Sequence, residues 1–533
     1  MLKEEREQVS VERTYNVYDP EISSDHKDYY ESIARSLMNL FPICSQGLSL
    51  AENIGGENAE QSQIIGDLMG QVEDFAEKLQ MLSKTLFDKY YQSKEQYARF
   101  LFSNTAYITI NLMDRNLLER TCDVRWWSLE TAFGRAVHLS NKFSDSLRET
   151  LEDCGNSEMA AFLVEPSLVF ERYPALQDDE KLTALATKVT EANAFACSRL
   201  EDIRRSYTLY RDLVITTRDG IVIANANCKR RRHVLGTFIA DEEWFSRAIA
   251  TKDGTGYFAQ DLQDSALEDD TSLIYSTAIR AKSEVDGAVI GSMGVLFDFS
   301  GESKIILDEV LPNQNGAPVD GWHCFLTNST GQVLQSSDPL AFPVGTRPYL
   351  PRSHRALGQG KRQMSFIDML GLPSAVFSAK TDGYLEYPGL GWAAHLIVPK
   401  SVVFASDATA RRDVDMSELH RSQILPGINR ETYKQLSIDQ QDITRISLNG
   451  MIFAAQVGAE GNCLAPVFNQ ITKTGRRVAE MMHAFLDEMA LSDLDLNLTS
   501  LENFSDQAIN IVDRNLFERA ADIRWWATDA VFW

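Results

Sequence analysis

Side chains that could perform catalysis or hold a metal are scattered through this sequence. The histidines stand singly and form neither an HExxH nor an HD pair, and the seven cysteines include no CxxC pair. Adjacent carboxylates occur at Asp269 and Asp270, but in a polar stretch where solvation rather than acid–base chemistry is expected. We therefore expect no catalytic site, no metal site and no cofactor, and a protein that is not an enzyme.

One charged segment that ends in two tryptophans occurs twice. Residues 114–127 read DRNLLERTCDVRWW, and residues 513–526 read DRNLFERAADIRWW. Over 110–127 and 509–526 the two copies are identical at 12 of 18 positions, which indicates a true repeat.

The first copy has the apolar periodicity of an amphipathic helix. One face is predicted to carry Ile110, Met113, Leu117, Val124 and Trp127, and the other mostly Asp114, Arg115, Glu119 and Asp123, with Arg115 and Glu119 as an ion pair. Neighbouring residues on a helix point about 100° apart, so one tryptophan can be buried while the other faces a neighbour. The segment is either a packing motif of a helical bundle or an aromatic contact for another protein, made by Trp126, Trp127, Trp525 and Trp526.

Composition narrows the class of protein. The 533 residues predict three or four domains, and 76 acidic against 52 basic residues give a net charge of −24. Such a charge argues against nucleic acid or an anionic membrane as a partner. The N-terminus has no apolar leader, no run is long enough to span a membrane, and the scattered cysteines are typical of reduced thiols, so we expect a cytoplasmic protein.

The sequence pattern divides the chain into segments. Residues 1–24 are expected to be disordered or extended, and residues 25–206 to form a helical bundle that carries the first repeat copy. At 207 the pattern becomes β-rich. Residues 406–490 are predicted to be helical, SDLDLNLTS at 492–500 to be a linker, and 503–533 to form a helix with the second copy.

Two hairpins of similar design mark the β-rich region. LVITTRDGIVIANA turns at Asp219-Gly220, and CFLTNSTGQVLQSS, which begins at Cys324, repeats the order of strand, short turn with glycine, and strand. The region 207–405 is therefore predicted to hold two related α+β modules in tandem, 207–310 and 320–405.

This region resembles the double Cache domain, the tandem PAS-like sensor module of bacterial chemoreceptors and sensor enzymes. The resemblance is carried by LVITTRDGIVIANA, DEEWFSRAI at 241–249, GAVIGSMGVLFDF at 287–299 and YPGLGWAAHLIVPKSVVFA at 387–405. It implies an α+β fold in which antiparallel-sheet modules are flanked by long-helix bundles, with a small-molecule pocket over the sheet.

The resemblance also implies which residues bind the ligand: Trp244, Phe245, Tyr257, Tyr275 and Asp298. In the amino-acid-binding subset an arginine two residues before the aromatic pair holds the carboxylate, and here that position is Glu242. A carboxylate cannot pair with a carboxylate, so the ligand is expected to be an amine or another small metabolite, which the aromatic residues could surround. The alternative is that these aromatic residues only fill the core.

Residues 442–461, DITRISLNGMIFAAQVGAEG, resemble the signalling tip of methyl-accepting chemotaxis proteins. Leu448, Asn449, Ala454 and Ala455 match its pattern, whereas Phe453 and Gln456 replace its glutamate and arginine. The resemblance implies a chemotaxis kinase or a coupling protein as partner, with the contact chemistry altered, and a homodimer formed through helices.

Two hypotheses for function follow. The first is a cytoplasmic small-molecule sensor of the chemotaxis type that relays ligand binding to flanking helices. The second is a non-enzymatic scaffold that keeps a ligand-free Cache-like fold and binds partners through its helices. Only seven residues follow the second repeat copy, so we also expect that the chain ends early relative to its relatives, with a second helix-plus-module unit missing.

Overall fold

The computed structural model describes residues 24–54, 59–151, 154–314, 317–404, 416, 427–458 and 461–527. The predicted N-terminal segment lies outside this part of the chain, apart from its last residue, Ser24. The polypeptide divides into two compact units. Unit 1 comprises Met1–Ser103, Met364–Val376 and Val398–Ala508, and unit 2 comprises Asn104–Gln363, Phe377–Ile397 and Ile509–Trp533. These units group residues that lie close together and are not shown to fold independently. They therefore do not test the domain boundaries predicted from the sequence, which stay predictions.

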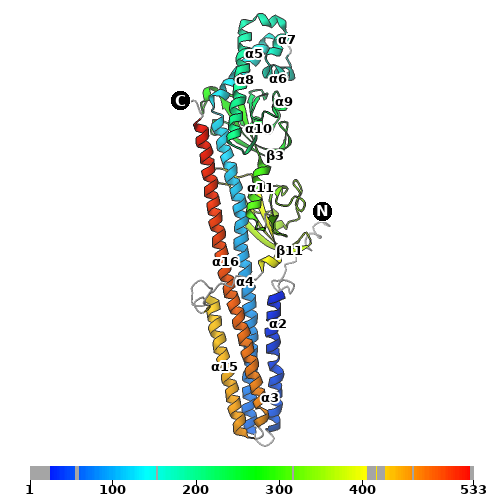
Figure 1. The fold of residues 1–533 in the computed structure, drawn as a ribbon. Coiled ribbons are helices and arrows are strands. Elements are labelled where there is room, and N and C mark those ends of the chain that lie inside the picture. The colour runs from blue at the N-terminus through cyan, green and yellow to red at the C-terminus, as the bar shows by residue number, and fades with distance from the viewer. Residues whose placement is uncertain are drawn as a thin grey trace, which may run out of the picture. The chain divides into compact units, whose positions relative to one another are not determined.

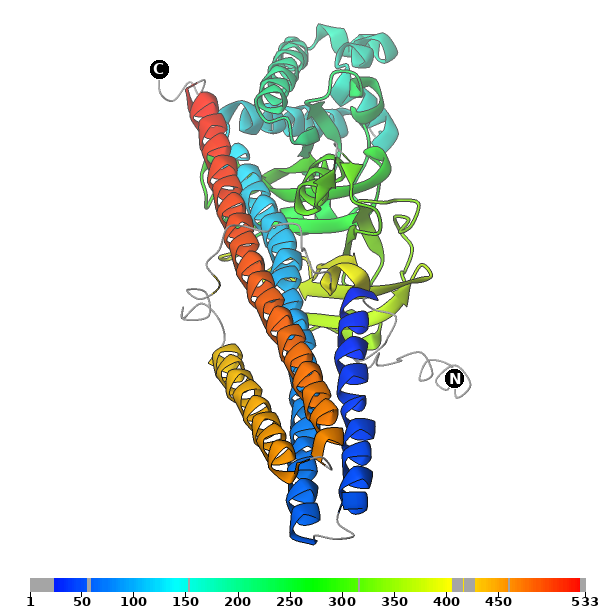
Figure 2. The same ribbon diagram turned by 60° about the horizontal axis from the view of Figure 1, so that its bottom comes forward.

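Unit 1 is a bundle of two helical hairpins. The first hairpin pairs α2 (Ser24–Met38) and α3 (Leu40–Ile54) with the first part of α4 (Ala59–Trp127). The second pairs α15 (Gly427–Val457) with the first part of α16 (Ala465–Trp526), across the short helix η3 (Gly461–Cys463). Both hairpins run antiparallel, as Figure 2 shows. Their buried apolar residues form one shared core.

The bundle core extends the repeat far beyond the two charged segments. Ten buried apolar positions of the first hairpin have a buried apolar counterpart in the second at the same offset of 399 that relates the two charged segments. The pairs are Leu37/Leu436, Cys44/Ile443, Ile65/Leu464, Leu68/Val467, Met69/Phe468, Val72/Ile471, Leu79/Val478, Leu86/Phe485, Phe87/Leu486 and Tyr90/Met489. The chain therefore contains two copies of a whole helical hairpin, of which the charged segment is the C-terminal end.

The predicted linker at 492–500 is wrong, because these residues lie inside α16. The stretch contains neither glycine nor proline, and Leu494 packs against the buried Ala490 one turn earlier. Ser500 is buried, and its hydroxyl lies 2.7 Å from the hydroxyl of Tyr97. Packing of this kind overrides the weak helix propensity of aspartate, asparagine and serine.

Unit 2 contains the first five-stranded antiparallel sheet. Its strands are β1 (Tyr210–Thr217), β2 (Val222–Asn225), β3 (Phe258–Ser265), β4 (Glu268–Arg280) and β5 (Val289–Phe297), in the order β2-β1-β5-β4-β3. Helix α10 (Glu243–Ile249) packs on one face, while α5 (Thr131–Thr150) and α8 (Glu180–Ser206) pack against the other. The remaining short helices are α6 (Asn156–Val164), α7 (Ser167–Arg172), η1 (Pro174–Asp178), α9 (Arg231–Val234) and η2 (Ala281–Ser283).

The second sheet repeats this topology. Its strands are β8 (His323–Thr327), β9 (Val333–Ser336), β10 (Arg362–Met369), β11 (Leu372–Lys380) and β12 (Ala393–Pro399), in the order β10-β11-β12-β8-β9. Numbered within each sheet, both orders read 2-1-5-4-3. The two modules are joined by α11 (Phe299–Val310), and the smaller elements are β6 (Asn313–Gln314), β7 (Ala317–Pro318), α12 (Arg352–Arg355) and α13 (Lys400–Val403).

The fold class predicted from the sequence is confirmed: two related antiparallel-sheet modules in tandem, flanked by long helices. Both predicted hairpins form, as β1-β2 and β8-β9. Their turns place Gly220 at φ +82° and Gly331 at φ +81°, backbone conformations that other residues adopt at a cost.

Candidate functional site

The two copies of the charged segment lie side by side in unit 2, as the ends of α4 and α16 (Figure 1). Nη2 of Arg519 lies 2.9 Å from Oε1 of Glu119. The ring centroids of Trp126 and Trp526 are 6.3 Å apart. Because each contact joins positions about 400 residues apart, the two helices run parallel and in register.

Arg120 occupies the centre of this helix pair. Its side chain is 2% exposed, and its guanidinium group lies over the rings of Tyr210 (5.2 Å) and Phe297 (5.6 Å). Its nitrogens lie 3.4 Å from the carboxylate of Asp123 and 3.7 Å from that of Glu518. Its Nε and Nη1 atoms are buried without a hydrogen-bond partner among the described residues. This cation therefore depends on two carboxylates, one from each helix.

The acidic partners of Arg120 have perturbed protonation. Burial raises the pKa of Asp123 to about 6, although Arg120 and the Tyr210 hydroxyl, which donates to Asp123, act in the opposite direction. Burial also raises the pKa of Glu518 to about 7, with Glu119 and Asp123 adding repulsion. Small changes around the helix pair can therefore change its charge near neutral pH.

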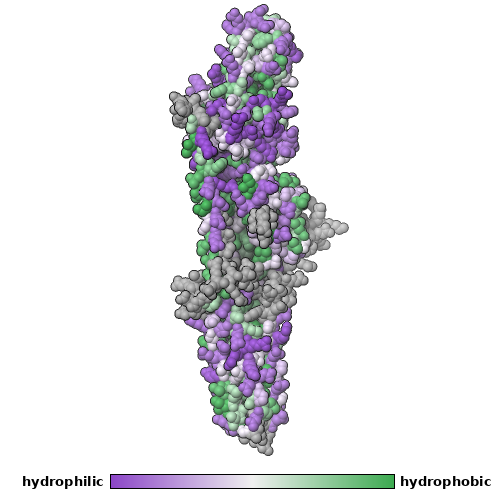
Figure 3. All heavy atoms as spheres, in the orientation of Figure 1, coloured by the Kyte–Doolittle hydropathy of each residue, from purple (hydrophilic) through white to green (hydrophobic). Residues whose placement is uncertain are grey.

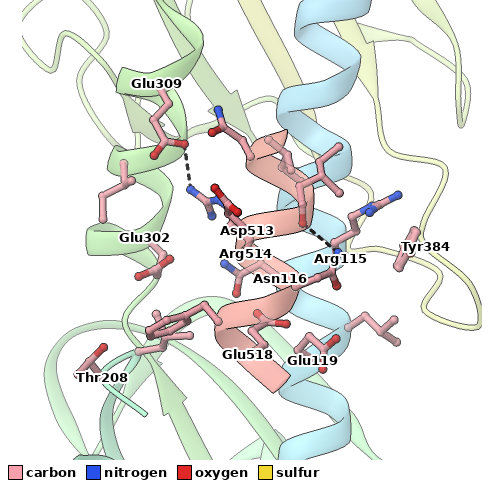
Figure 4. Close-up of a pocket in the computed structure, with 18 of the residues that line it drawn as sticks. Arg115, Asn116, Glu119, Thr208, Glu302, Glu309, Tyr384, Asp513, Arg514 and Glu518 are labelled. Carbon is pink, nitrogen blue, oxygen red and sulfur yellow. Dashed lines mark hydrogen bonds and ion pairs between the residues drawn. The ribbon is translucent and has the colours of Figure 1, made fainter. Parts of the chain in front are cut away.

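A cavity of about 570 Å³ opens beside this network, between α4, α11, α16 and the turn at Tyr384 and Leu385. Figure 4 shows side chains from all three helices directed toward it. Its charged lining consists of two arginines and five carboxylates: Arg115, Arg514, Glu119, Glu302, Glu309, Asp513 and Glu518. Carboxylates outnumber arginines in the lining, and two of them, Glu119 and Glu518, also contact Arg519 and Arg120, which lie outside it.

Two arginines tie the helices of the cavity to its other walls. Nη2 of Arg514 lies 3.0 Å from Oε2 of Glu309 on α11. The guanidinium of Arg115 lies 4.4 Å from the ring centroid of Tyr384, and its Nε donates to Asn111. The sequence predicted an ion pair between Arg115 and Glu119. In the structure Arg115 contacts Tyr384 instead, and Glu119 pairs with Arg519. Burial raises the pKa of Glu302 as well.

The predicted aromatic pair fills the space over the first sheet. Trp244 is fully buried, and its Nε1 donates to Oε2 of Glu242 at 2.6 Å. Phe245 packs edge-on at 6.4 Å between ring centroids. Gly294 of β5 lies so close beneath the indole that a methyl group there would come within 2.9 Å of the ring. The side chain of Trp244 therefore fills the space over the sheet in which the small-molecule pocket was predicted.

The carboxylate of Glu242 makes hydrogen bonds within the first sheet module. Besides the indole, its carboxylate accepts hydrogen bonds from the Ser265 hydroxyl and the Ala266 amide, both at 2.8 Å. These bonds hold the start of α10 to the β3-β4 turn.

The other predicted ligand-binding residues lie elsewhere. Ser276 bonds to the carbonyl of Trp244, so its neighbour Tyr275 points to the opposite face of β4, where its hydroxyl lies 3.2 Å from that of Tyr387. Tyr257 lies under Arg125 of α4 at 5.3 Å. Asp298 caps α11 and pairs with Arg211 at 3.1 Å. The structure keeps Trp244 and Phe245 together and does not bring the five residues into one pocket.

A second cavity, of about 540 Å³, lies near Asp298. It is lined by Phe297 and Phe299 on either side of Asp298, by Arg211, and by polar groups that include Asp264, Asp269, Asp270 and Gln335. Neither cavity is lined by any of the five predicted residues.

The predicted signalling residues fall into two groups. Leu448, Asn449, Ala454 and Ala455 lie on α15 near the turn of the second hairpin, where Ala454 is buried and the others are exposed. In the first charged segment Trp127 is 2% exposed and Trp126 is 49% exposed, the expected division of roles. Trp526 is exposed and contacts Trp126, and the side chain of Trp525 lies outside the described residues.

The sequence did not identify the charged network as a site. Asp114 and Asp123 were predicted on the polar face, yet both are buried. The identity of Arg120 and Arg519, and of Glu119 and Glu518, in the two copies was the available signal. The two copies pack against each other in the tertiary structure, and sequence periodicity cannot predict such a contact.

Two absences concern the described part of the chain. Its histidine, cysteine, aspartate and glutamate side chains form no group of three that could hold a metal ion. None of its helices combines the length and the apolar character needed to cross a membrane.

Comparison with known proteins gave matches among solved structures alone. No protein-family model and no curated protein matches the chain. The sensory domain of the Campylobacter jejuni chemoreceptor Tlp3 is 12% identical, with a TM-score of 0.30, and the match covers 53% of this chain and 99% of that one. The sensor domain of the V. cholerae histidine kinase DctB is 14% identical, with a TM-score of 0.28, over 49% of this chain and 97% of that one.

A further match is the Tlp3 ligand-binding domain in complex with 4-methylisoleucine, at 12% identity and a TM-score of 0.27, over 54% of this chain and 96% of that one. These neighbours are sensory ligand-binding domains of chemoreceptors and histidine kinases. Such identities and TM-scores carry no function over to this chain, and the fold assignment rests on the strand order of its own two sheets.

Proposed function

We propose that this protein is a non-enzymatic, cytoplasmic sensor of a small cationic molecule, and that the ligand binds in the 570 Å³ cavity between α4, α11 and α16. The observation that carries the proposal is the lining of this cavity, where five carboxylates from three helices face two arginines. A cation such as an amine would offset that excess of negative charge and would contact the ring of Tyr384.

The position of the cavity suits a signalling role. A ligand there would touch both copies of the charged segment and also α11, which joins the two sheet modules. Any shift between α4 and α16 changes the distance of Glu518 from Arg120, and this contact is buried and sensitive to geometry. A ligand can bias such a shift only if it binds one arrangement more tightly than the other.

The proposed output passes along the helices. Both α4 and α16 continue from unit 2 into the hairpins of unit 1, so a shift at their ends has a covalent route to the bundle. The resemblance of 442–461 to a chemoreceptor tip favours a chemotaxis kinase or a coupling protein as the partner, and a homodimer formed by helices of the bundle. The seven cysteines, all free, favour a reducing compartment.

A scaffold function is the second candidate, and Trp244 favours it. The space over the first sheet, where the Cache resemblance places a ligand, is filled by this indole. A protein whose module binds nothing there could use the module only to hold its helices.

Thermal unfolding of the full chain with a panel of small molecules separates the two candidates. We expect amines and quaternary ammonium compounds to raise the Tm by several degrees at saturating concentration, and dicarboxylates to leave it unchanged. Glu309→Gln should weaken the stabilisation at least several-fold. The matched control is Glu158→Gln on α6, which lies away from the cavity lining and should bind as the parent does. If no cation stabilises the chain, the scaffold is correct.

A further inference from the structure

The carboxylates that line the 570 Å³ cavity differ in whether they already have a cationic partner. Three of the five form ion pairs: Glu119 with Arg519, Glu309 with Arg514, and Glu518 with Arg120. The two others are Glu302 on α11 and Asp513 on α16, and they belong to no ion pair among the described residues. The negative charge that the cavity offers to a ligand therefore comes from Glu302 and Asp513.

Both arginines of the lining already have partners. Nη2 of Arg514 lies 3.0 Å from Oε2 of Glu309. The guanidinium of Arg115 lies over the ring of Tyr384, and its Nε donates to Asn111. A carboxylate ligand would have to compete with these partners for a cation. The engaged arginines and the unpaired carboxylates together favour a cationic ligand over an anionic one.

Asn116 on α4 presents an acceptor that lacks a donor. Its side chain lines the cavity and is 8% exposed, and its Oδ1 atom is buried without a hydrogen-bond partner among the described residues. The amide of this side chain interacts with the carboxylate of Glu302 and favours its ionised form. Because an unpaired buried carbonyl oxygen is costly, Oδ1 of Asn116 indicates a donor that none of the described side chains supplies.

Glu302 and Asp513 also lack donors that would complete their surroundings. Burial raises the pKa of Glu302, so the groups around it do not fully offset the cost of burying its charge. Asp513 is exposed, whereas its counterpart in the first copy, Asp114, is buried and accepts a hydrogen bond from the Thr381 hydroxyl. Figure 4 shows Asn116, Glu302 and Asp513 around the cavity, one on each of its three helices.

The cavity also has apolar lining beside these acceptors. Leu112, Leu118, Ile305, Ile511 and Phe517 contribute to it, and Phe517 on α16 is 58% exposed. Figure 3 shows hydrophobic residues among hydrophilic ones along α16. A ligand with an alkyl part can cover this apolar surface while its charged end meets the acceptors.

We propose that the ligand of this cavity carries a primary ammonium group, which donates to Oδ1 of Asn116 and to the carboxylates of Glu302 and Asp513. This refinement rests on the proposed function, because it names the kind of cation that binds there. A primary ammonium group supplies three donors together with its charge, whereas a trimethylammonium group supplies the charge alone. Only the first can satisfy the oxygen of Asn116, so the ligand class is a primary alkylamine.

Calorimetry on the full chain at pH 8 with two probes tests this assignment. Pentylammonium and pentyltrimethylammonium have the same alkyl chain and the same charge, and only the first can donate hydrogen bonds. We expect the first to bind at least tenfold more tightly. Equal affinities, or tighter binding of the trimethyl compound, would overturn the assignment and leave the proposed function intact. If neither probe binds, the proposed function itself is wrong and the assignment with it.

Asn116→Leu separates hydrogen bonding from the size of the head group, because leucine has a similar shape and no acceptor. The affinity for pentylammonium should fall about tenfold, and that for pentyltrimethylammonium should stay within about threefold. Asn156→Leu, at an exposed position on α6 away from the lining, is the control and should change neither. Equal losses for the two probes would overturn the assignment. If the leucine variant does not fold, Asn116→Asp keeps an acceptor at this position, and loss of the preference there would contradict the assignment in the same way.

Discussion

Glu119 and Arg519 join the two copies of the repeated segment through an ion pair whose oxygen and nitrogen are 2.9 Å apart. The pair connects α4 to α16, with 399 residues of chain between its two members. It fixes the register in which Trp126 meets Trp526, and it lies one residue from the buried Arg120 on α4. The ion pair that marks the register of the two helices is therefore exposed, whereas the neighbouring contacts of Arg120 are buried.

The ion pair itself should contribute little to stability. The side chain of Arg519 is 52% exposed, and exposed pairs are screened by solvent. A double-mutant cycle with Glu119→Gln and Arg519→Gln should give a coupling free energy of about 0.2–1 kcal/mol by urea denaturation. A coupling several times larger would mean that the pair is shielded from water.

Arg120 should behave in the opposite way. Arg120→Met leaves Asp123 and Glu518 buried without their cation, which should lower the free energy of unfolding by about 3–5 kcal/mol near pH 8. Near pH 5 the two carboxyl groups can take up protons, so the loss should be smaller there. Urea denaturation at both pH values measures the difference, and an equal loss at both would show that the two carboxylates are not the reason.

Trp244 gives a test of the filled space over the first sheet. Gly294→Ala adds a methyl group within 2.9 Å of the indole and should destabilise the chain by about 1–3 kcal/mol. Trp244→Phe combined with Gly294→Ala should cost less than the sum of the single changes, because the smaller ring makes room. Additive losses by thermal or urea denaturation would place the indole away from Gly294 and would reopen the predicted pocket.

Asp114 should make stability depend on pH. Burial raises its pKa to about 6 from an ordinary value near 3.8, so the folded state holds the proton more tightly than the unfolded state. Stability from this group is therefore lost as pH rises from about 4 to 6, by about 3 kcal/mol in total. Asp114→Asn removes the titration, so its unfolding free energy relative to the parent should rise over that window. A constant difference between the two proteins would exclude this account.

The two sheet modules could be predicted from local sequence signals. The candidate site could not, because it is formed by tertiary contacts. The turns at Gly220 and Gly331 need glycine at positive φ, and each separates two β-rich runs, so both hairpins could be predicted. The apolar face from Ile110 to Trp127 followed in the same way from its period. The stretch 492–500 was misjudged because its polar composition hides a continuous helix.

The charged network could not be predicted because its members come from distant parts of the chain. Arg120 and Asp123 are three residues apart, yet Glu518 reaches them from α16 and Tyr210 from β1. The predicted pocket failed to assemble for a related reason. Trp244 and Tyr275 were both predicted to bind the ligand, but alternation along β4 and the position of α10 put them on opposite faces of one sheet.

Glu518 should couple ligand binding to pH. Its raised pKa of about 7 results first from burial and then from Glu119 and Asp123, while Arg120 and Arg519 favour the ionised form. A bound cation in the cavity stabilises the carboxylate, so binding releases a proton below pH 7 and the affinity rises with pH. A quaternary ammonium probe, whose own charge does not titrate, should bind about tenfold more tightly at pH 8 than at pH 6 by calorimetry. Glu518→Gln should flatten this dependence, whereas Glu309→Gln should weaken binding and keep the slope, and an affinity that falls with rising pH would contradict the assignment.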